Sequence, residues 1–221
     1  MVDLAEIWAY IADGSKRQAD ALIDRLPLQL INTKSPEQTV DLINNGTEAL
    51  SIRSIRFSGQ QFQTKSTCGS TLEPEASCSF SASFETKTQG SYTGLITIVD
   101  SASSKPQFVE LSGTATAVKV SPASLNFGNQ KVGTKSATQT LTATNKGGST
   151  ITFQGVGIQF GGSEFSSTNN CMGQPLEPGA SCKAWVTFKP TRKGKTSATF
   201  IFLLPSGSVS PALITLTGTG D

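Results

Sequence analysis

The sequence predicts a mainly β chain, in which two tandem β-sandwiches follow a short α-helical hairpin. Three observations support this: a change of composition near Pro27, a hydrophobic period of two from Leu28 onward, and a set of motifs that occurs twice. Of the 221 residues, 55 are Ser or Thr and only 15% are charged. This composition favours strands and turns over helices.

Residues 1–26 are predicted to form the helical hairpin. They hold 8 of the 34 charged residues but only one Ser, one Gly and no Thr. Gly14 suits the end of a first helix, Ser15 to Gln18 is typical of a capping box, and Pro27 would stop a second helix. Apolar residues recur at helical spacing in two runs, which are Leu4, Ile7, Trp8, Ile11 and Ala19, Leu22, Ile23, Leu26.

From Leu28 onward, apolar and polar residues alternate as in half-buried strands. Residues 78–84 alternate without exception. Ile52 and Ile55 are out of phase with each other, which indicates a β-bulge. The other predicted strands, separated by Gly, Pro, Asn and Ser turns, are 28–31, 38–43, 50–57, 92–99 and 108–111.

An internal repeat divides the β part of the chain. Three segments recur in the same order: 39–46 as 140–147, 68–78 as 171–182, and 111–114 as 216–219. The predicted domains are therefore 1–26, 27–117 and 118–221. About 100 residues with seven or so short strands is the size of an immunoglobulin-like sandwich. The short junction predicts a semi-rigid, end-to-end pair.

One pair of cysteines falls in each copy, Cys68 with Cys78 and Cys171 with Cys182. The alternatives are four free buried thiols or one disulfide in each copy. Recurrence in otherwise diverged repeats favours the disulfides, and hence a secreted, periplasmic or cell-surface location. A zinc site is disfavoured because the two copies would have to converge and no C-x2-C motif is present.

Composition also excludes several functions. The chain has no His, which removes Ser-His-Asp and Cys-His catalysis and His-ligated metals. A net charge of +2 is too small for a nucleic-acid binder recognised by charge alone. No apolar run is long enough to cross a bilayer, and no signal peptide is visible. We therefore expect no enzyme activity, cofactor, metal or nucleic-acid partner.

Two features are candidate surface contacts. Lys189, Arg192, Lys193 and Lys195 form a local basic patch, for which a solvated hairpin tip is favoured over a surface for an acidic partner or glycan. Trp185 falls on the strand face opposite Cys182. A structural role, covering an edge between sheets, is favoured for Trp185 over an exposed contact.

Five segments of the second copy carry a resemblance to a known family. They are 125–134, 144–147, 176–182, 186–190 and 216–220. These segments resemble bacterial choice-of-anchor D repeats, relatives of hydin-like and abnormal-spindle-type immunoglobulin-like domains. The resemblance covers 28–220 and is strongest in 121–220, although the first copy lacks the opening Phe-Gly and Val-Gly elements. It implies non-catalytic modules used for spacing, adhesion or assembly in secreted or surface proteins.

Residues 3–26 resemble the N-terminal helical hairpin of RelE/ParE-type toxins, without the sheet that would carry the rest of that fold. The sequence thus predicts a non-enzymatic tandem module of an exported bacterial protein, acting as a structural spacer or adhesion unit with an unidentified protein partner. The alternatives are protein binding through an exposed strand edge and a toxin–antitoxin-related fusion. The hairpin's apolar faces would have to be buried, either by packing on the first sandwich or by self-association with another copy of the chain.

Overall fold

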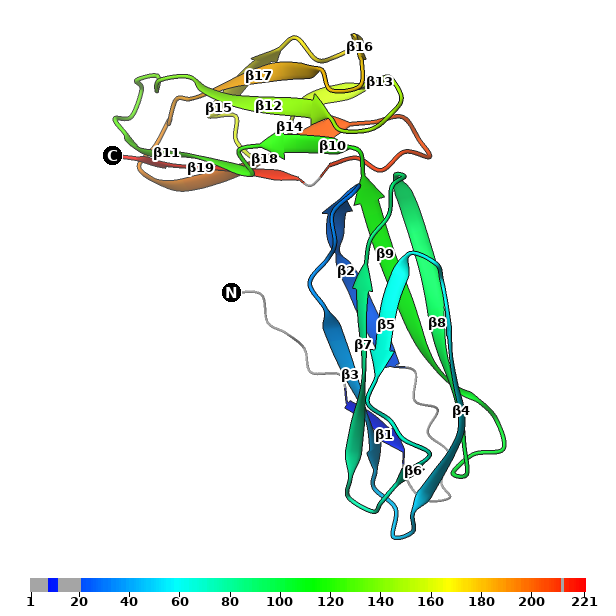
Figure 1. The fold of residues 1–221 in the computed structure, drawn as a ribbon. Coiled ribbons are helices and arrows are strands. Elements are labelled where there is room, and N and C mark those ends of the chain that lie inside the picture. Colours follow the sequence, from blue (N-terminus) through cyan, green and yellow to red (C-terminus); the bar gives the residue numbers. More distant parts are fainter. Residues whose placement is uncertain (1–7, 12–20, 212) are drawn as a thin grey trace. The chain divides into compact units, whose positions relative to one another are not determined.

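The computed structural model describes residues 8–11, 21–211 and 213–221, and its regular elements are β-strands (Figure 1). The chain divides into two compact units. The first comprises Met1–Lys87 with Ser91–Thr114, and the second comprises Thr88–Gly90 with Ala115–Asp221. We call them module 1 and module 2. No helix in the described ranges is long and apolar enough to span a bilayer.

Module 1 is built from two sheets, with the strand orders β1-β3-β7-β5 and β2-β9-β8-β4-β6. A register shift between Ile52 and Ser54 where β4 pairs with β8 confirms the predicted bulge. The strands are β1 (Trp8–Ile11), β2 (Ala21–Leu30), β3 (Gln38–Asn44), β4 (Leu50–Ser58), β5 (Phe62–Ser66), β6 (Thr71–Leu72), β7 (Ser77–Phe84), β8 (Gly90–Asp100) and β9 (Gln107–Thr116).

Module 2 repeats this plan with sheets of order β10-β12-β17-β15 and β11-β19-β18-β14 and a short β13-β16 pair. Strand β11 runs parallel to β19, whereas β12 and β17 pair antiparallel. The strands are β10 (Val118–Ser121), β11 (Ser124–Gln130), β12 (Gln139–Asn145), β13 (Ile151–Thr152), β14 (Gly155–Phe160), β15 (Phe165–Asn169), β16 (Pro175–Leu176), β17 (Ser181–Phe188), β18 (Gly194–Leu203) and β19 (Ile214–Gly220).

Each core is made by alternate residues of the facing strands. In β17, the side chains of Cys182, Ala184, Val186 and Phe188 are buried, while the residues between them are exposed or partly exposed. Strand β7 shows the same alternation over its first half. This period of two is the pattern that predicted the strands, because successive strand side chains point to opposite faces.

The prediction of a helical hairpin over 1–26 is wrong wherever the structure describes that segment. Trp8–Ile11 is a strand that pairs parallel with β3, and Ala21–Leu30 is one strand running through Pro27. The rest of the predicted hairpin lies outside the described residues. Aromatic and β-branched residues favour strands, and an apolar spacing over so few residues does not distinguish the two structures. Pro27 is tolerated because β2 lies at a sheet edge.

Candidate functional site

The four cysteines form two disulfides at equivalent places in the modules. Cys68 pairs with Cys78, and Cys171 pairs with Cys182. In each pair the second cysteine begins an inner strand, β7 or β17, and the first follows the neighbouring strand, β5 or β15. Disulfides of this kind are typical of proteins that fold in an oxidising compartment.

A buried asparagine ties together two of the repeated motifs. In module 2, the side-chain amide of Asn145 donates to Ser149 O at 2.8 Å and to Leu176 O at 2.9 Å, and its Oδ1 accepts from Gly147 N at 2.9 Å. Asn44 makes the same three bonds at the corresponding positions of module 1. The recurring Asn-x-Gly and Leu-Glu-Pro segments therefore hold one end of each sandwich together.

The closing Leu-x-Gly-Thr motif has a packing role. A Cβ atom on Gly218 would lie 2.5 Å from the ring of Phe188, and one on Gly113 would lie 2.6 Å from the ring of Phe84. Both phenylalanines are fully buried. Each glycine thus leaves room for the phenylalanine ring beside it in the core.

The opening motif of module 2 also serves the core. The register of β11 with β19 shifts between Asn126 and Asn129, and Gly128 at that shift has a φ of 63°. The ring of Phe127 lies 5.7 Å from that of Phe165 and 6.0 Å from that of Phe188. The bulge therefore places an aromatic residue against the core from an edge strand.

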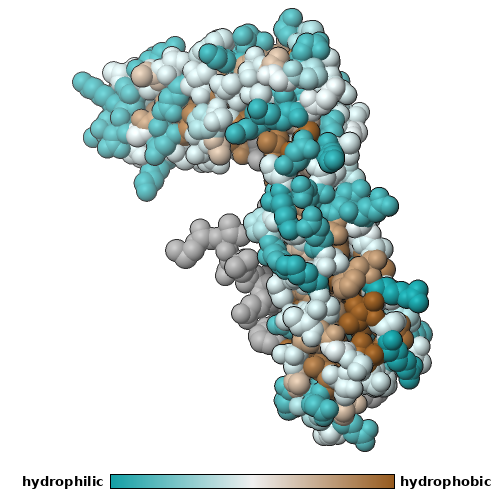
Figure 2. Space-filling view, viewed as in Figure 1, coloured by the Kyte–Doolittle hydropathy of each residue, from teal (hydrophilic) through white to brown (hydrophobic). Residues whose placement is uncertain are grey.

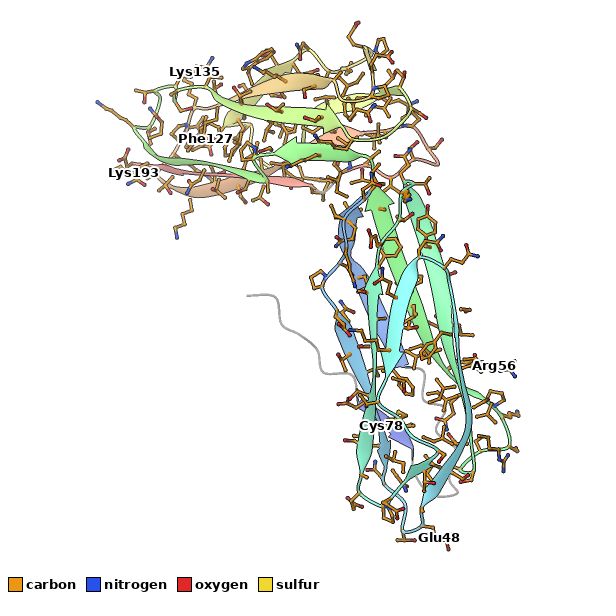
Figure 3. The ribbon with its side chains drawn as sticks, viewed as in Figure 1. Glu48, Arg56, Cys78, Phe127, Lys135 and Lys193 are labelled. Carbon is orange, nitrogen blue, oxygen red and sulfur yellow. A yellow bond between two sulfur atoms is a disulfide. The ribbon has the colours of Figure 1, made fainter. Side chains whose placement is uncertain are left out.

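The predicted basic patch lies at one end of module 2, and the structure adds two lysines to it. The loop after β11 is joined there to the loop between β17 and β18, because Gly133 N donates to Pro190 O at 2.8 Å, and to the residue after β19, because Val132 N donates to Asp221 O at 3.0 Å. Lys135 and Lys193 mark this end in Figure 3. We call its exposed cations the cationic tip: Lys131, Lys135, Lys189, Arg192, Lys193 and Lys195.

One carboxylate at this end is engaged in holding the loop. Glu164 is buried, and its Oε1 accepts hydrogen bonds from Thr191 N at 2.7 Å and Thr191 Oγ1 at 2.8 Å. These two bonds hold the pKa of Glu164 below its usual range, and the charge of Arg192 acts in the same direction. Its carboxylate thus fixes the loop that carries most of the cations.

Trp185 does not belong to the cationic tip and does not lie at a sheet edge. It lies on β17, an inner strand, in register with Thr140 on one side and Thr168 on the other. Its side chain is partly exposed on the face opposite Cys182. The residues that the sequence suggested as surface contacts are therefore in two separate places on the module.

Sequence reasoning missed Lys131 and Lys135. They are more than fifty residues from Lys189 along the chain and join it through the pairing of β11 with β19. A signal was present in the charge distribution: residues 118–221 carry nine Lys and Arg against three Asp and Glu, whereas residues 1–117 carry nine against thirteen. The small net charge conceals this difference.

The described residues contain no group of three or more His, Cys, Asp or Glu placed to hold a metal ion. Figure 2 shows hydrophilic side chains over the end of module 2 that carries the cationic tip.

The second module matches a known family model. Residues 116–219 match the HYDIN/CFA65/VesB-like Ig-like domain. This match supports the hydin-like, immunoglobulin-like part of the predicted resemblance; it supports neither the choice-of-anchor D nor the RelE/ParE part. It agrees with the two-sheet architecture of module 2 and with a type of domain that is generally non-catalytic.

Comparison with solved structures finds distant similarities, and comparison with curated protein sequences finds no match. A protein of unknown function from Porphyromonas gingivalis W83 is 12% identical, with a TM-score of 0.36, over 91% of this chain and 97% of that one. The ASH/PapD-like domain 7 of human CEP192 is 15% identical, with a TM-score of 0.38, over 48% and 86%. The Vibrio cholerae VesB protease is 15% identical, with a TM-score of 0.36, over 73% and 63%.

Proposed function

We propose that the chain is a non-enzymatic spacer of an exported bacterial protein, made of two immunoglobulin-like modules that each carry a disulfide. One observation carries this proposal: the motifs that recur between the modules make the same internal contacts in both. The disulfides, the buried asparagines and the glycines against phenylalanine all hold a sandwich together. Recurrence of these internal contacts in both modules is expected where the modules serve as structural units.

A distance measurement tests the spacing role. Spin labels are introduced on unnatural amino acids, which spare the cysteines, at Thr47 in module 1 and Lys193 in module 2. A spacer gives one narrow distance distribution by pulsed electron paramagnetic resonance. Labels at Lys146 and Lys193 show the width for a single module. A Thr47–Lys193 distribution several times wider than this reference contradicts the spacing role.

Export has its own test. The four cysteines of protein isolated from the native cell envelope are alkylated before and after reduction, and the mass is measured. Export into an oxidising compartment predicts that all four cysteines react only after reduction. Four thiols that react without reductant, or recovery of the protein in the cytoplasmic fraction alone, would refute it.

A second candidate function is protein binding through the edge of β14. This strand is the last of its sheet, Phe160 is 63% exposed, and residues 155–163 contain no charge and no Pro. Uncharged edges of this kind are templates for pairing with another strand. The bulge between Ile158 and Phe160 limits regular pairing to the first four residues, and a new strand would displace the 3.3 Å bond from Asn169 to Val156 O.

Photo-crosslinking tests this edge. A photoreactive residue at Gln159 is expected to capture one discrete protein in the native envelope, and Ile158→Lys is expected to abolish that product. A photoreactive residue at Thr187, on the outer face of inner strand β17, is the control. Equal capture at both positions, or capture that survives Ile158→Lys, would rule the β14 edge out.

A further inference from the structure

The charge at the end of module 2 is far from even. Six of the nine Lys and Arg of residues 118–221 lie in the cationic tip, and within the described part of module 2 the side-chain carboxylates at this end are those of Glu164 and Asp221. Glu164 is already bonded to Thr191. The tip thus holds an excess of positive charge that its own acids do not balance.

Module 1 forms the same end with fewer cations. Asn32 there occupies the place of Gly133, since both have a positive φ and both donate their N–H across the loop, to Thr86 O and Pro190 O respectively. Carrying this alignment along the two loops places Leu30, Glu85, Gln89 and Ser91 where module 2 has Lys131, Lys189, Lys193 and Lys195, while Lys34 takes the place of Lys135. The fold therefore does not require the first four of these charges.

The cations also lack partners of their own. None of the six forms an ion pair or a side-chain hydrogen bond within the described parts of the chain. In module 1, by contrast, Lys34 donates to Gln63 Oε1 at 2.7 Å and Lys65 pairs with Glu37 at 3.4 Å. Six cations beside two carboxylates repel one another on balance, so the tip would gain from binding an external anion.

We propose that the cationic tip binds an anionic polysaccharide. Five of its six cations are lysines, which are mobile point charges suited to a diffuse polyanion rather than to paired recognition of single carboxylates. Its neighbours include Gly, Thr and Ser, while Pro190 is buried and Val132 and Phe127 are only partly exposed. Protein interfaces depend on apolar or aromatic anchors, and the tip has no fully exposed one because Phe127 packs against the core, which favours a carbohydrate polyanion over a protein.

The proposal goes beyond the spacing role and does not depend on it. It concerns one end of module 2, whereas spacing concerns how the two modules are held. The disulfides support a location outside the cytoplasm, where a surface of this kind can meet charged glycans. The charge rather than the shape of the tip would select the ligand, so binding should weaken with salt.

The test measures binding of the full chain to dextran sulfate and to alginate at low salt, with neutral dextran as the blank. The double variant Lys193→Glu/Lys195→Glu removes charge from the tip. The matched control, Lys146→Glu/Lys183→Glu, makes the same change in net charge at exposed sites away from it. We expect the tip variant to weaken binding at least about tenfold and the control less than about twofold.

Four outcomes would overturn the proposal. They are no binding to either polyanion at low salt, equal weakening by both double variants, equal binding of neutral dextran, and tighter binding of polyglutamate than of either polysaccharide. The last would assign the tip to an acidic protein. Both variants alter exposed side chains only, and a circular dichroism spectrum identical to that of the unaltered chain excludes unfolding as the cause. A wide spin-label distance distribution would contradict the spacing role but would leave the interpretation of these binding measurements unchanged.

Discussion

Positive φ angles recur at matched positions of the two modules, but the residues that adopt them differ. Gly133 has a φ of 81° where Asn32 has 61°, and Gly179 has 80° where Glu75 has 62°. Glycine adopts this conformation without steric cost, asparagine adopts it more readily than most, and other residues lose about 1–2 kcal/mol. The turns are therefore the common requirement, and module 1 meets it with less suitable residues.

This comparison gives a prediction at Gly133. A Cβ atom there would meet nothing within 4 Å, so a substitution tests conformation alone. We expect Gly133→Asn to change the free energy of unfolding by only a few tenths of a kcal/mol, and Gly133→Val to lower it by about 1–2 kcal/mol. Denaturant unfolding of both variants measures the difference. Equal losses would show that side-chain size, not backbone conformation, governs the position.

A second prediction concerns the glycine against the core ring. Gly218→Ala would place a Cβ atom 2.5 Å from the ring of Phe188, which has no room to move because it is fully buried. We expect a loss of about 1–3 kcal/mol in the free energy of unfolding. Gly148→Ala is the control, since a Cβ there has nothing within 4 Å. A Gly218→Ala protein as stable as the control would contradict the packing role.

At the scale of the elements, the alternation of apolar and polar residues predicted strands correctly where one face of the strand is buried. The predicted strands 38–43, 78–84 and 92–99 correspond to β3, β7 and β8. The two-residue strands β6, β13 and β16 are too short to show a period. The helix prediction for residues 8–11 and 21–26 failed for a different reason. Their apolar spacing fits a helix face as well as it fits short strands, and pairing with strands distant in sequence decides which structure forms.

The same limit applies to the cationic tip. Four of its six cations lie within seven residues, and the sequence pointed to them directly. Lys131 and Lys135 join them only because β11 pairs with β19 and the adjoining loops are hydrogen-bonded. A charge cluster formed across a sheet is not visible as a local run. Comparing the charge of the two repeats would have found it.

The disulfides differ between modules in their access to solvent, which gives a prediction about reduction. Cys68 is partly exposed, whereas Cys171 is 1% exposed and Cys182 is buried. A thiolate must reach a sulfur atom to attack it, so we expect the Cys68–Cys78 disulfide to be reduced first in native protein. Timed alkylation followed by mass spectrometry measures the order. Earlier labelling of Cys171 and Cys182 would show that exposure does not control it.

Over the whole molecule, the small net charge is the sum of an acidic and a basic part. Residues 1–117 carry four more acids than bases, and residues 118–221 carry six more bases than acids. A surface that meets a partner responds to the charge near it rather than to the total, because ions screen charges more than about 10 Å away. The net charge of the whole chain is therefore a weaker argument against binding to a charged partner than it first suggests.

This asymmetry gives a final prediction, which is independent of any glycan. At the pH where its net charge is zero, the full chain should still be retained on a cation exchanger, because the resin attracts the local positive charge of the cationic tip whatever the total charge is. Lys193→Glu/Lys195→Glu should elute at clearly lower salt than Lys146→Glu/Lys183→Glu, although the two variants have equal net charge. Co-elution would show that the resin responds to total charge alone, and the tip would then be no more than six solvated side chains.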